Sequence, residues 1–318
     1  MRDDEAGLVL GLDVGGTSSR ALVSDLAGRV LGTGVAGGGN PNSRPPGEAV
    51  GRMVEAAREA LGELDPAAVR GCVVGMAGIT KLADPDFREL FRAEWARLGL
   101  RCAVEAVGDG DVAFAAGTPE PDGVVLIAGT GAIAARVREH RTEASAGGWG
   151  WLLGDEGSAF WLGREAVRTT LRALDGGVRP TGLAAAVCER LGAHDRDSVI
   201  TAANSGPPIR LAELAPLVTE CPCEAAEDVV RRGARLLADT AEAAGPGDDP
   251  IVLAGSLLAP GNRIGEAVRA ELRARGFADP RSAGSGAAGA AWLAALPHAP
   301  VPTAVHAALL GARGRVQP

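Results

Sequence analysis

Two short glycine-rich segments, about 115 residues apart, constrain what this chain can fold into. The first reads Gly11-Leu-Asp-Val-Gly-Gly-Thr-Ser-Ser-Arg20 and the second reads Gly123-Val-Val-Leu-Ile-Ala-Gly-Thr-Gly131. In each, an apolar run typical of a strand ends in glycines and a threonine. Glycine lets backbone N–H groups approach an anion closely, and threonine adds a hydroxyl donor. Because a further strand-like run follows each turn, we expect two β-hairpins that enclose a phosphate chain from opposite sides.

The overall composition limits the classes of protein to which this chain can belong. A chain of 318 residues with 46% apolar residues can form one large or two ordinary domains, each with its own core. It has no apolar run of about 18 residues that could span a bilayer. Met1-Arg-Asp-Asp-Glu5 lacks the basic-then-apolar order of a leader peptide, so we expect a cytoplasmic protein without membrane contact. The net charge of −8 argues against a nucleic-acid partner.

Lysine and cysteine usage excludes two common sites. Lys81 is the sole lysine, and no Gly-Lys-Ser/Thr tripeptide of a P-loop is present. Phosphate would therefore be bound by backbone amides, hydroxyls and a metal. The pair in Cys221-Pro-Cys223 has no further ligands at suitable spacing for zinc, so we expect a turn at the start of a helix there.

Strand and helix patterns alternate in the same order in both halves of the chain. Apolar strand-like runs and helical spacings indicate an α/β protein of two related lobes with a cleft between them. We place the boundary near residue 117, giving an N-terminal lobe 1–117 and a C-terminal lobe 118–318, and expect the tail after Pro297 to be loosely packed or partly disordered. The expected strands are Leu8–Val14, Arg20–Asp25, Arg29–Val35, Val69–Met76, Cys102–Val107, Val124–Ala128, Ala132–Val137 and Ile251–Ala254.

Asp13 closes the first strand, two residues before Gly15-Gly16-Thr17-Ser18. A carboxylate at this position can hold Mg²⁺, directly or through water, beside phosphates bound by the turn. Thr17 is the natural hydroxyl donor, with Thr130 in the second turn. The alternative is an aspartate that only shapes the turn, and the second glycine turn favours the metal site.

Two aspartates lie where a strand leads into a helix, in Val107-Gly-Asp-Gly-Asp111. Carboxylates at such junctions point into the ligand site of open α/β sheets. One could accept the proton of a substrate hydroxyl during phosphoryl transfer. We assign Asp109 as this base and Asp111 as the helix N-cap.

Tryptophans, glycines and acids are concentrated in Gly147-Gly-Trp-Gly-Trp-Leu-Leu-Gly-Asp-Glu-Gly-Ser158. Carboxylates accept paired hydroxyl hydrogen bonds, and an aromatic ring covers an apolar sugar face, so this segment indicates a polyol site. A capped helix start with packed aromatics is the structural alternative. Further on, Gly255-Ser256 follows a buried strand and could pack against a nucleoside, although glycine is common at strand ends.

Taken in order, these segments resemble the N-acetylglucosamine kinase branch of the BadF/BadG/BcrA/BcrD ATPase family, within the actin-like sugar kinase superfamily. The resemblance runs from residue 7 to about 295, and its most specific part is GGWG…GDEGS. The matching strings are GLDVGGTSSRALV, GGGNPN, VVGMAGI, GDGDVAFAAG, GVVLIAGTGAIA, GGWGWLLGDEGSAFWLGREAV and IVLAGSLL.

The resemblance implies a two-lobed actin-like (ribonuclease H-like) fold and a role for each matching position. Asp109 would be the catalytic aspartate that activates the sugar 6-hydroxyl. Asn40 and Asp155 would bind the sugar, although Asn42 competes with Asn40. Two positions depart from the family, because Gly108 replaces Asn or Thr and Ala132 replaces Ser. The remaining implied contacts are Gly78, Trp149 and Gly150 for sugar, and Gly15, Gly16, Thr17, Ser18, Gly129, Thr130, Gly131, Gly255 and Ser256 for ATP.

The implied activity is ATP- and Mg²⁺-dependent phosphorylation of the 6-hydroxyl of an amino sugar, most simply N-acetylglucosamine, by a homodimer. Kinases for another sugar, such as glucosamine or N-acetylmuramate, are alternatives. A further alternative is an activator ATPase of the same superfamily, which needs paired cysteines for an iron–sulfur cluster. No cysteine lies near either glycine turn in the sequence, which disfavours that reading.

Overall fold

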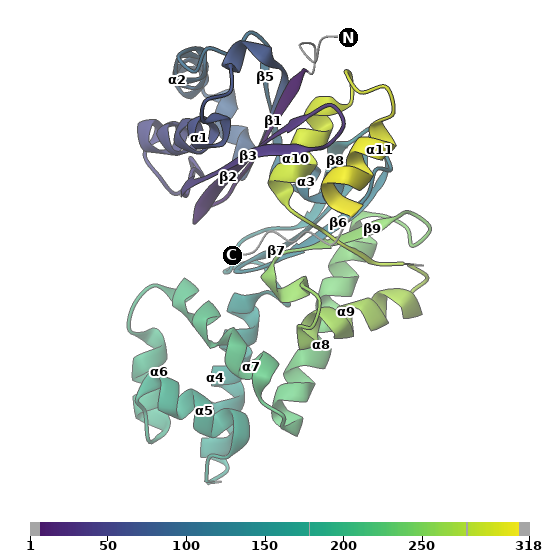
Figure 1. The fold of residues 1–318 in the computed structure, drawn as a ribbon. Coiled ribbons are helices and arrows are strands. Elements are labelled where there is room, and N and C mark those ends of the chain that lie inside the picture. Colours follow the sequence, from purple (N-terminus) through teal and green to yellow (C-terminus); the bar gives the residue numbers. More distant parts are fainter. Residues whose placement is uncertain (1–6, 178, 278, 312–318) are drawn as a thin grey trace. The chain divides into compact units, whose positions relative to one another are not determined.

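The computed structural model of the chain describes residues 7–177, 179–277 and 279–311 (Figure 1). It divides into two compact units, each built on a five-stranded sheet. Unit 1 comprises the described residues up to Asp122, Val137–Thr142 and those from Ala283 onward, and unit 2 comprises Gly123–Arg136 and Glu143–Ser282. Residues 1–6, for which we expected no leader peptide, lie outside the described ranges.

The sheet of unit 1 has the strand order β3-β2-β1-β4-β5. Strands β1 and β2 are antiparallel, with Leu8 opposite Asp25 and Val14 opposite Ser19, whereas β1, β4 and β5 run parallel. The strands are β1 (Leu8–Val14), β2 (Ser18–Asp25), β3 (Val30–Gly37), β4 (Val69–Met76) and β5 (Val104–Gly108), and the helices are α1 (Pro46–Leu61), α2 (Pro85–Ala96), α3 (Asp109–Ala115), α10 (Gly286–Ala295) and α11 (Pro302–His306).

Successive side chains of β1 point to opposite faces of this sheet, and each face packs against different helices. Leu10 and Leu12 belong to the core formed with α1 and α2, whereas Val9 belongs to a second core formed with α3 and α10. Gly11 is on the same face as Val9, and a Cβ atom there would lie 2.0 Å from the backbone nitrogen of Ala291. Helix α10 therefore packs directly on β1, which is possible because nearly all its residues are alanine or glycine.

The sheet of unit 2 has the strand order β10-β9-β6-β7-β8. Strands β6 and β9 are parallel, with Val124 opposite Ile251, and β6 leads into β7 through Gly129–Gly131. The strands are β6 (Gly123–Ala128), β7 (Ala132–Arg138), β8 (Arg141–Gly147), β9 (Ile251–Ala254) and β10 (Arg281–Ser282), and the helices are α4 (Ala159–Asp175), α5 (Gly182–Leu191), α6 (Arg196–Asn204), α7 (Ala215–Glu220), α8 (Glu224–Ala244) and α9 (Arg263–Ala274).

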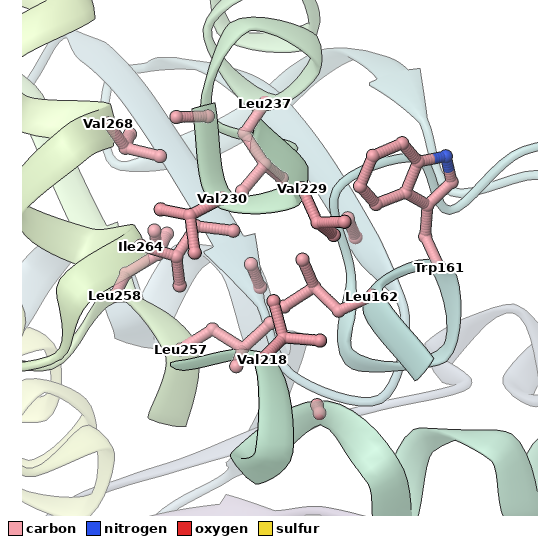
Figure 2. Packing of buried hydrophobic residues seen from close by; sticks show 14 of the residues in the cluster. Trp161, Leu162, Val218, Val229, Val230, Leu237, Leu257, Leu258, Ile264 and Val268 are labelled. Carbon is pink, nitrogen blue, oxygen red and sulfur yellow. The ribbon is translucent and has the colours of Figure 1, made fainter. Parts of the chain in front are cut away.

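The core of unit 2 lies between these helices and the sheet. Figure 2 shows side chains of α4, α7, α8 and α9 meeting the turn that follows β9. Trp161 and Leu162 come from α4, Leu237 from α8 and Ile264 from α9, and each is at most 4% exposed. This core holds the start of α4 and the end of β9 in place, and both adjoin residues that we expected to bind ligands.

The division into units differs from the lobes expected from the sequence. Residues after Ser282 were expected in the C-terminal lobe, but α10 and α11 pack in unit 1, because the small residues of α10 fit against Gly11 and against Val112 of α3.

The expectation of a loosely packed tail after Pro297 is wrong for the described residues up to 311. Trp292 Nε1 donates to the carbonyl of Pro302 over 2.9 Å, and His306 Nε2 lies 2.9 Å from the carbonyl oxygen of Ala115. Such long-range contacts leave no trace in local sequence patterns. Across the described residues, no helix is long and apolar enough to cross a membrane.

Candidate active site

Three parallel strands of unit 1 end at one edge of its sheet. Asp13 of β1 pairs with Gly75 of β4, and Met76 of β4 pairs with Gly108 of β5. The turn after β1, the segment after β4 and the start of α3 are thus brought together. Ligands of open α/β sheets bind at the carboxyl ends of such strands.

Asp13 is a half-buried carboxylate at this edge. Burial and the negative charge of Asp109 raise its pKa to about 6, and Arg20, its partner on β2, opposes the shift. Its Oδ2 atom faces Gly286, the first residue of α10, where a Cβ atom would lie only 2.4 Å away. The carboxylate therefore contacts the N-terminal end of a helix, where the macrodipole favours negative charge.

Asp109 and Asp111 have different surroundings, as expected. Asp111 Oδ2 accepts from the Gly108 N–H over 3.0 Å, and its Oδ1 accepts from the N–H and the hydroxyl of Thr142 over 2.7 and 2.6 Å. It is 4% exposed, so its carboxylate is fully engaged in structural hydrogen bonds. The N-cap position itself is held by Gly108, so our assignment of Asp111 as N-cap is corrected to the third helical residue, which accepts the N-cap N–H.

Asp109 accepts a local hydrogen bond from the Gly110 N–H over 3.1 Å. Burial raises its pKa, with a smaller contribution from the charge of Asp111, and backbone hydrogen bonds oppose the shift. Asp13, which is half-buried, and Asp109, which is exposed, are thus two interacting carboxylates at one sheet edge. A carboxylate with a raised pKa is a stronger proton acceptor than an ordinary one.

The turn that follows Asp13 is short and open. The Gly15 N–H donates to the Ser18 carbonyl over 2.9 Å, and Thr17 is exposed. A Cβ atom at Gly16 would meet no described atom within 4 Å, and neither glycine has a positive φ. Neither backbone strain nor packing requires glycine at 16. The space beside this residue is therefore open to a ligand.

The loop 38–43 rests against this turn and carries both candidate asparagines. The Gly39 N–H donates to the Gly15 carbonyl over 3.1 Å. Asn40 Oδ1 accepts from the Asn42 N–H over 2.9 Å. Gly78 has φ +79°, and a Cβ atom there would lie 2.7 Å from both Asn40 Oδ1 and Asn42 Nδ2. Gly78 thus lies close to both asparagines, and the structure does not decide which of the two would bind the sugar.

In unit 2, the turn Gly129–Gly131 is fixed by the start of α4. The carbonyls of Gly129 and Thr130 accept from the N–H groups of Ala159 and Phe160 over 2.8 and 3.3 Å. The turn thereby satisfies N–H groups of α4 that would otherwise lack partners. As at Gly16, a Cβ atom at Gly129 would meet no described atom within 4 Å.

Asp155 contacts this second turn. Its Oδ1 accepts from the Ala132 N–H over 3.2 Å, and a Cβ atom at Gly131 would lie 2.8 Å from its Oδ2. Its φ of +54° is unusual for a residue with a side chain, and among the described residues only Glu139 and His140 share this feature. Such conformations cost about 1–2 kcal/mol and are concentrated at functional sites.

The aromatic residues near Asp155 fall into two groups. Phe160 and Trp161 are buried, and Trp161 stacks on the guanidinium of Arg232 at 5.5 Å. Trp149 is 70% exposed and Trp151 38% exposed. Of these four aromatic residues, Trp149 and Trp151, with Gly150 at φ +79° between them, remain available to a ligand.

Gly255 and Ser256 follow β9 beside the end of β6. Gly255 has φ +91°, and a Cβ atom there would lie 2.2 Å from the carbonyl oxygen of Ala128. Glycine is therefore required here by the backbone itself, and the turn is positioned next to Gly129. Both residues are exposed.

Sequence reasoning missed Gly286 and Arg20, which border Asp13. The only signal for Gly286 was its place after Ser285, which caps α10 by accepting from the Ala288 N–H. The contact with Asp13 joins residues far apart in the chain and is not visible locally.

The fold is that of the actin-like ATPase sugar kinases. A candidate N-acetylglucosamine kinase from Chromobacterium violaceum matches with a TM-score of 0.72 at 23% identity, over 91% of this chain and 99% of that one. A ROK family glucokinase from Streptomyces griseus, in complex with glucose and AMPPNP, matches with a TM-score of 0.55 at 21% identity, over 91% and 99% of the two chains.

The chain belongs to the BadF/BadG/BcrA/BcrD ATPase family, whose model matches residues 10–294. It is 31% identical over 171 residues to the N-acetylmuramic acid/N-acetylglucosamine kinase of Clostridium acetobutylicum, covering 52% of this chain and 54% of that protein. It is 27% identical over 206 residues to the N-acetyl-D-glucosamine kinase of Dictyostelium discoideum, covering 61% and 63%. The matched regions thus span less than two thirds of these curated relatives.

Proposed function

We propose that this protein transfers the γ-phosphoryl group of ATP to the 6-hydroxyl of an amino sugar, with N-acetylglucosamine as the first candidate. The observation that carries the proposal is the pair of interacting carboxylates with raised pKa values, Asp13 and Asp109, beside an open glycine turn at one sheet edge. Membership of an ATPase family and similarity to two kinases named for N-acetylglucosamine support it.

In this proposal Asp109 is the general base. The sugar hydroxyl donates its proton to the Asp109 carboxylate as its oxygen attacks the γ-phosphorus in line, and ADP leaves. The raised pKa of Asp109 suits it to accept that proton at neutral pH. Asp111 takes no proton, because its oxygens are already engaged with Gly108 and Thr142.

Asp13 fits the requirements of a magnesium site. Mg²⁺ prefers oxygen ligands and is usually held by one or two carboxylates together with phosphate oxygens and water. Desolvation and the charge of Asp109 raise the pKa of Asp13 despite the opposing charge of Arg20, and the further positive charge of a divalent cation would stabilise its carboxylate form. When bound, the ion neutralises the charge of the nucleotide phosphates. Among the described residues no group of three or more His, Cys, Asp or Glu could hold a metal, so phosphate and water would complete its coordination.

The two glycine turns are assigned to the phosphates of ATP. In unit 1 these are Gly15, Gly16, Thr17 and Ser18, and in unit 2 they are Gly129, Thr130 and Gly131. The space beside Gly16 and Gly129 and the exposed hydroxyls of Thr17 and Thr130 support this assignment. Gly255 and Ser256 are assigned to the adenosine, because they are exposed and adjoin the second turn.

The sugar is assigned to Asn40, Gly78 and Asp155, with Trp149 and Gly150. Asn40 Oδ1 is occupied by the Asn42 N–H, which leaves the Asn40 NH₂ group to donate to a sugar oxygen. Asp155 uses one oxygen for the Ala132 N–H and can accept sugar hydroxyls with the other. We extend the proposal to a cytoplasmic homodimer without a nucleic-acid partner, in keeping with the net charge of −8.

A substrate panel tests the proposal. ADP release from MgATP is measured with N-acetylglucosamine, glucosamine, N-acetylmuramate, N-acetylmannosamine and glucose, and with no sugar. We expect an amino sugar to stimulate release strongly, with phosphate found on its 6-oxygen. Equal release with and without every sugar would reject the kinase and favour an activator ATPase.

A further inference from the structure

Two thiols that the proposed reaction does not use are held against each other in unit 2. Cys221 follows α7, and Cys223 is the N-cap of α8, as expected of a turn at a helix start. Their Sγ atoms lie 3.0 Å apart, and both residues are half-buried. Pro222 between them fixes the backbone, so the pair is held close before any ligand or reagent arrives.

Two helix N-termini converge on Cys223. Burial raises its pKa, but the hydrogen bond from the Cys221 thiol and the nearby backbone N–H groups of Ala226, Leu183 and Ala225 outweigh this effect and lower it. Ala225 and Ala226 are in the first turn of α8, and Leu183 is in the first turn of α5. Thiolates are favoured at helix N-termini, where backbone N–H groups and the macrodipole stabilise negative charge.

Cys221 has the opposite character. Burial and its hydrogen bond to Cys223 raise its pKa to about 11, so it stays a neutral thiol that donates to its partner. The pair therefore combines a thiol whose pKa is lowered with a neutral thiol in contact with it. Burial also raises the pKa of Cys72, Cys102 and Cys188, so among the five cysteines, all of them described, Cys223 alone has a lowered pKa.

The spacing disfavours a metal as the occupant of this pair. Tetrahedral zinc with Zn–S bonds of about 2.3 Å holds two sulfurs about 3.8 Å apart, well beyond the separation seen here. Within the described residues no third His, Cys, Asp or Glu joins the two thiols in a group that could hold a metal. A contact shorter than two metal ligands require is instead suited to direct bonding between the sulfurs.

We infer that Cys221 and Cys223 form a redox-active dithiol that hydroperoxides convert to an intramolecular disulfide, with Cys223 as the attacking and Cys221 as the resolving residue. The thiolate form of Cys223 attacks the terminal oxygen of the hydroperoxide, an S–O bond forms as the O–O bond breaks, and the hydroxide or alkoxide that leaves takes up a proton. The sulfur of Cys221 then attacks the sulfenic sulfur of Cys223, the S–S bond forms and water leaves with the thiol proton. Two thiols are oxidised, one hydroperoxide is reduced, and a thiol reductant reverses the change.

Gly182 leaves space for the sulfur atom of Cys223, because it has no side chain. It begins α5 with φ +51°, and a Cβ atom there would lie 3.1 Å from both Cβ and Sγ of Cys223. A side chain at 182 would press on the thiolate and displace the α5 backbone whose N–H group stabilises it. This arrangement is specific to Cys223 and does not involve the residues assigned to ATP or sugar.

Peptide mapping after hydrogen peroxide treatment tests the inference. The full-length protein is treated briefly, quenched in denaturant with an alkylating reagent and digested with trypsin. The peptide 211–231 contains both cysteines and no other. We expect it to be lighter by two hydrogens and to resist alkylation until reduced. Recovery of this peptide with both thiols alkylated after the peroxide treatment would overturn the inference.

Single variants assign the two roles. Cys221→Ser should accumulate a sulfenic acid at Cys223 that dimedone labels, whereas Cys223→Ser should consume peroxide at least about tenfold more slowly, because it lacks the low-pKa thiol. Cys188→Ser is the matched control and should oxidise like the unsubstituted protein. Equal rates for Cys221→Ser and Cys223→Ser would contradict the roles, and the peptide result decides the matter even if one variant fails to fold.

Discussion

The carboxylate of Asp13 lies against Gly286, where a Cβ atom would come within 2.4 Å of Oδ2. The proposed metal-binding carboxylate of β1 is thus positioned by the first residue of α10, from the other end of the chain. Gly286→Ala should displace Asp13 and lower kcat/KM by about tenfold or more, since small misplacements at a reacting centre are costly.

A matched control is available for this substitution. Gly47 lies in the first turn of α1, and a Cβ atom there would meet no described atom within 4 Å. Gly47→Ala should leave kcat/KM unchanged. Steady-state kinetics of both variants check the prediction, and unaltered catalysis by Gly286→Ala would show that Asp13 needs no such positioning.

Asp13 should destabilise the free protein at neutral pH. Its pKa in the fold is about 6 against an ordinary 3.8, so the folded state binds the proton more tightly than the unfolded state. The associated stability is full below pH 3.8 and is lost as the pH rises through about 6. The shift corresponds to at most about 3 kcal/mol. Asp13→Asn should therefore raise Tm at about pH 7.5 in the absence of nucleotide and metal while abolishing activity, and a lower Tm would contradict this.

Asp155 combines a left-handed backbone with a hydrogen bond to Ala132. Asp155→Asn keeps both features, because asparagine tolerates this conformation, and should raise KM for the sugar about tenfold with little change for ATP. Asp155→Ala loses the hydrogen bond and adds strain, and should unfold at lower denaturant concentration than Asp155→Asn. A change in KM for ATP alone would remove Asp155 from the sugar site.

Gly255 and Gly261 both have positive φ, but only Gly255 faces backbone, at 2.2 Å from the Ala128 carbonyl oxygen. Gly261→Ala carries only the strain of its φ, about 1–2 kcal/mol, whereas Gly255→Ala must also move β9 away from β6. We expect Gly255→Ala to be the less stable variant in urea unfolding and to bind ATP more weakly. Equal stability of the two variants would show that the close approach of residue 255 to the Ala128 carbonyl oxygen is relieved without destabilising the fold.

Local patterns predicted the strands that carry the site and missed the contacts that assemble it. The bounds of β1, β4 and β9 agree with the sequence prediction because apolar runs and turn residues mark them. Strand β8 was missed because most of its side chains are exposed and it has no apolar alternation. Helix α6 and the short strand β10 were also missed, and the packing of α10 and α11 depends on residues distant in sequence.

The candidate site, like the fold, was predicted from the sequence only in part. The sequence placed Asp109 and Asp111 at a helix start but assigned Asp111 to the N-cap, which Gly108 occupies, and the hydrogen bond from Thr142 to Asp111 could not be foreseen. The glycines at 16 and 129 were recognised from their pattern, and the structure adds that nothing in the described chain requires them. The choice between Asn40 and Asn42 stays open because both contact Gly78.

The acid limb of the pH profile should report Asp109. Since burial raises its pKa above the ordinary 3.8, kcat/KM should fall as the pH is lowered through a midpoint above that value. The measurement is kcat/KM for the preferred sugar between about pH 4.5 and 8 at saturating MgATP. Constant kcat/KM over this whole range would contradict a base with a raised pKa.

The central claim is that Asp109 accepts the proton of the sugar hydroxyl. The most direct test compares sugar-dependent ADP release by Asp109→Asn with that of Asp248→Asn, an exposed aspartate outside the assigned residues. ATP affinity is measured alongside by calorimetry. Loss of a general base costs about 10²–10⁴ in rate, so we predict such a loss for Asp109→Asn with ATP affinity retained, and none for Asp248→Asn. Turnover by Asp109→Asn equal to that of the unsubstituted protein would contradict the account.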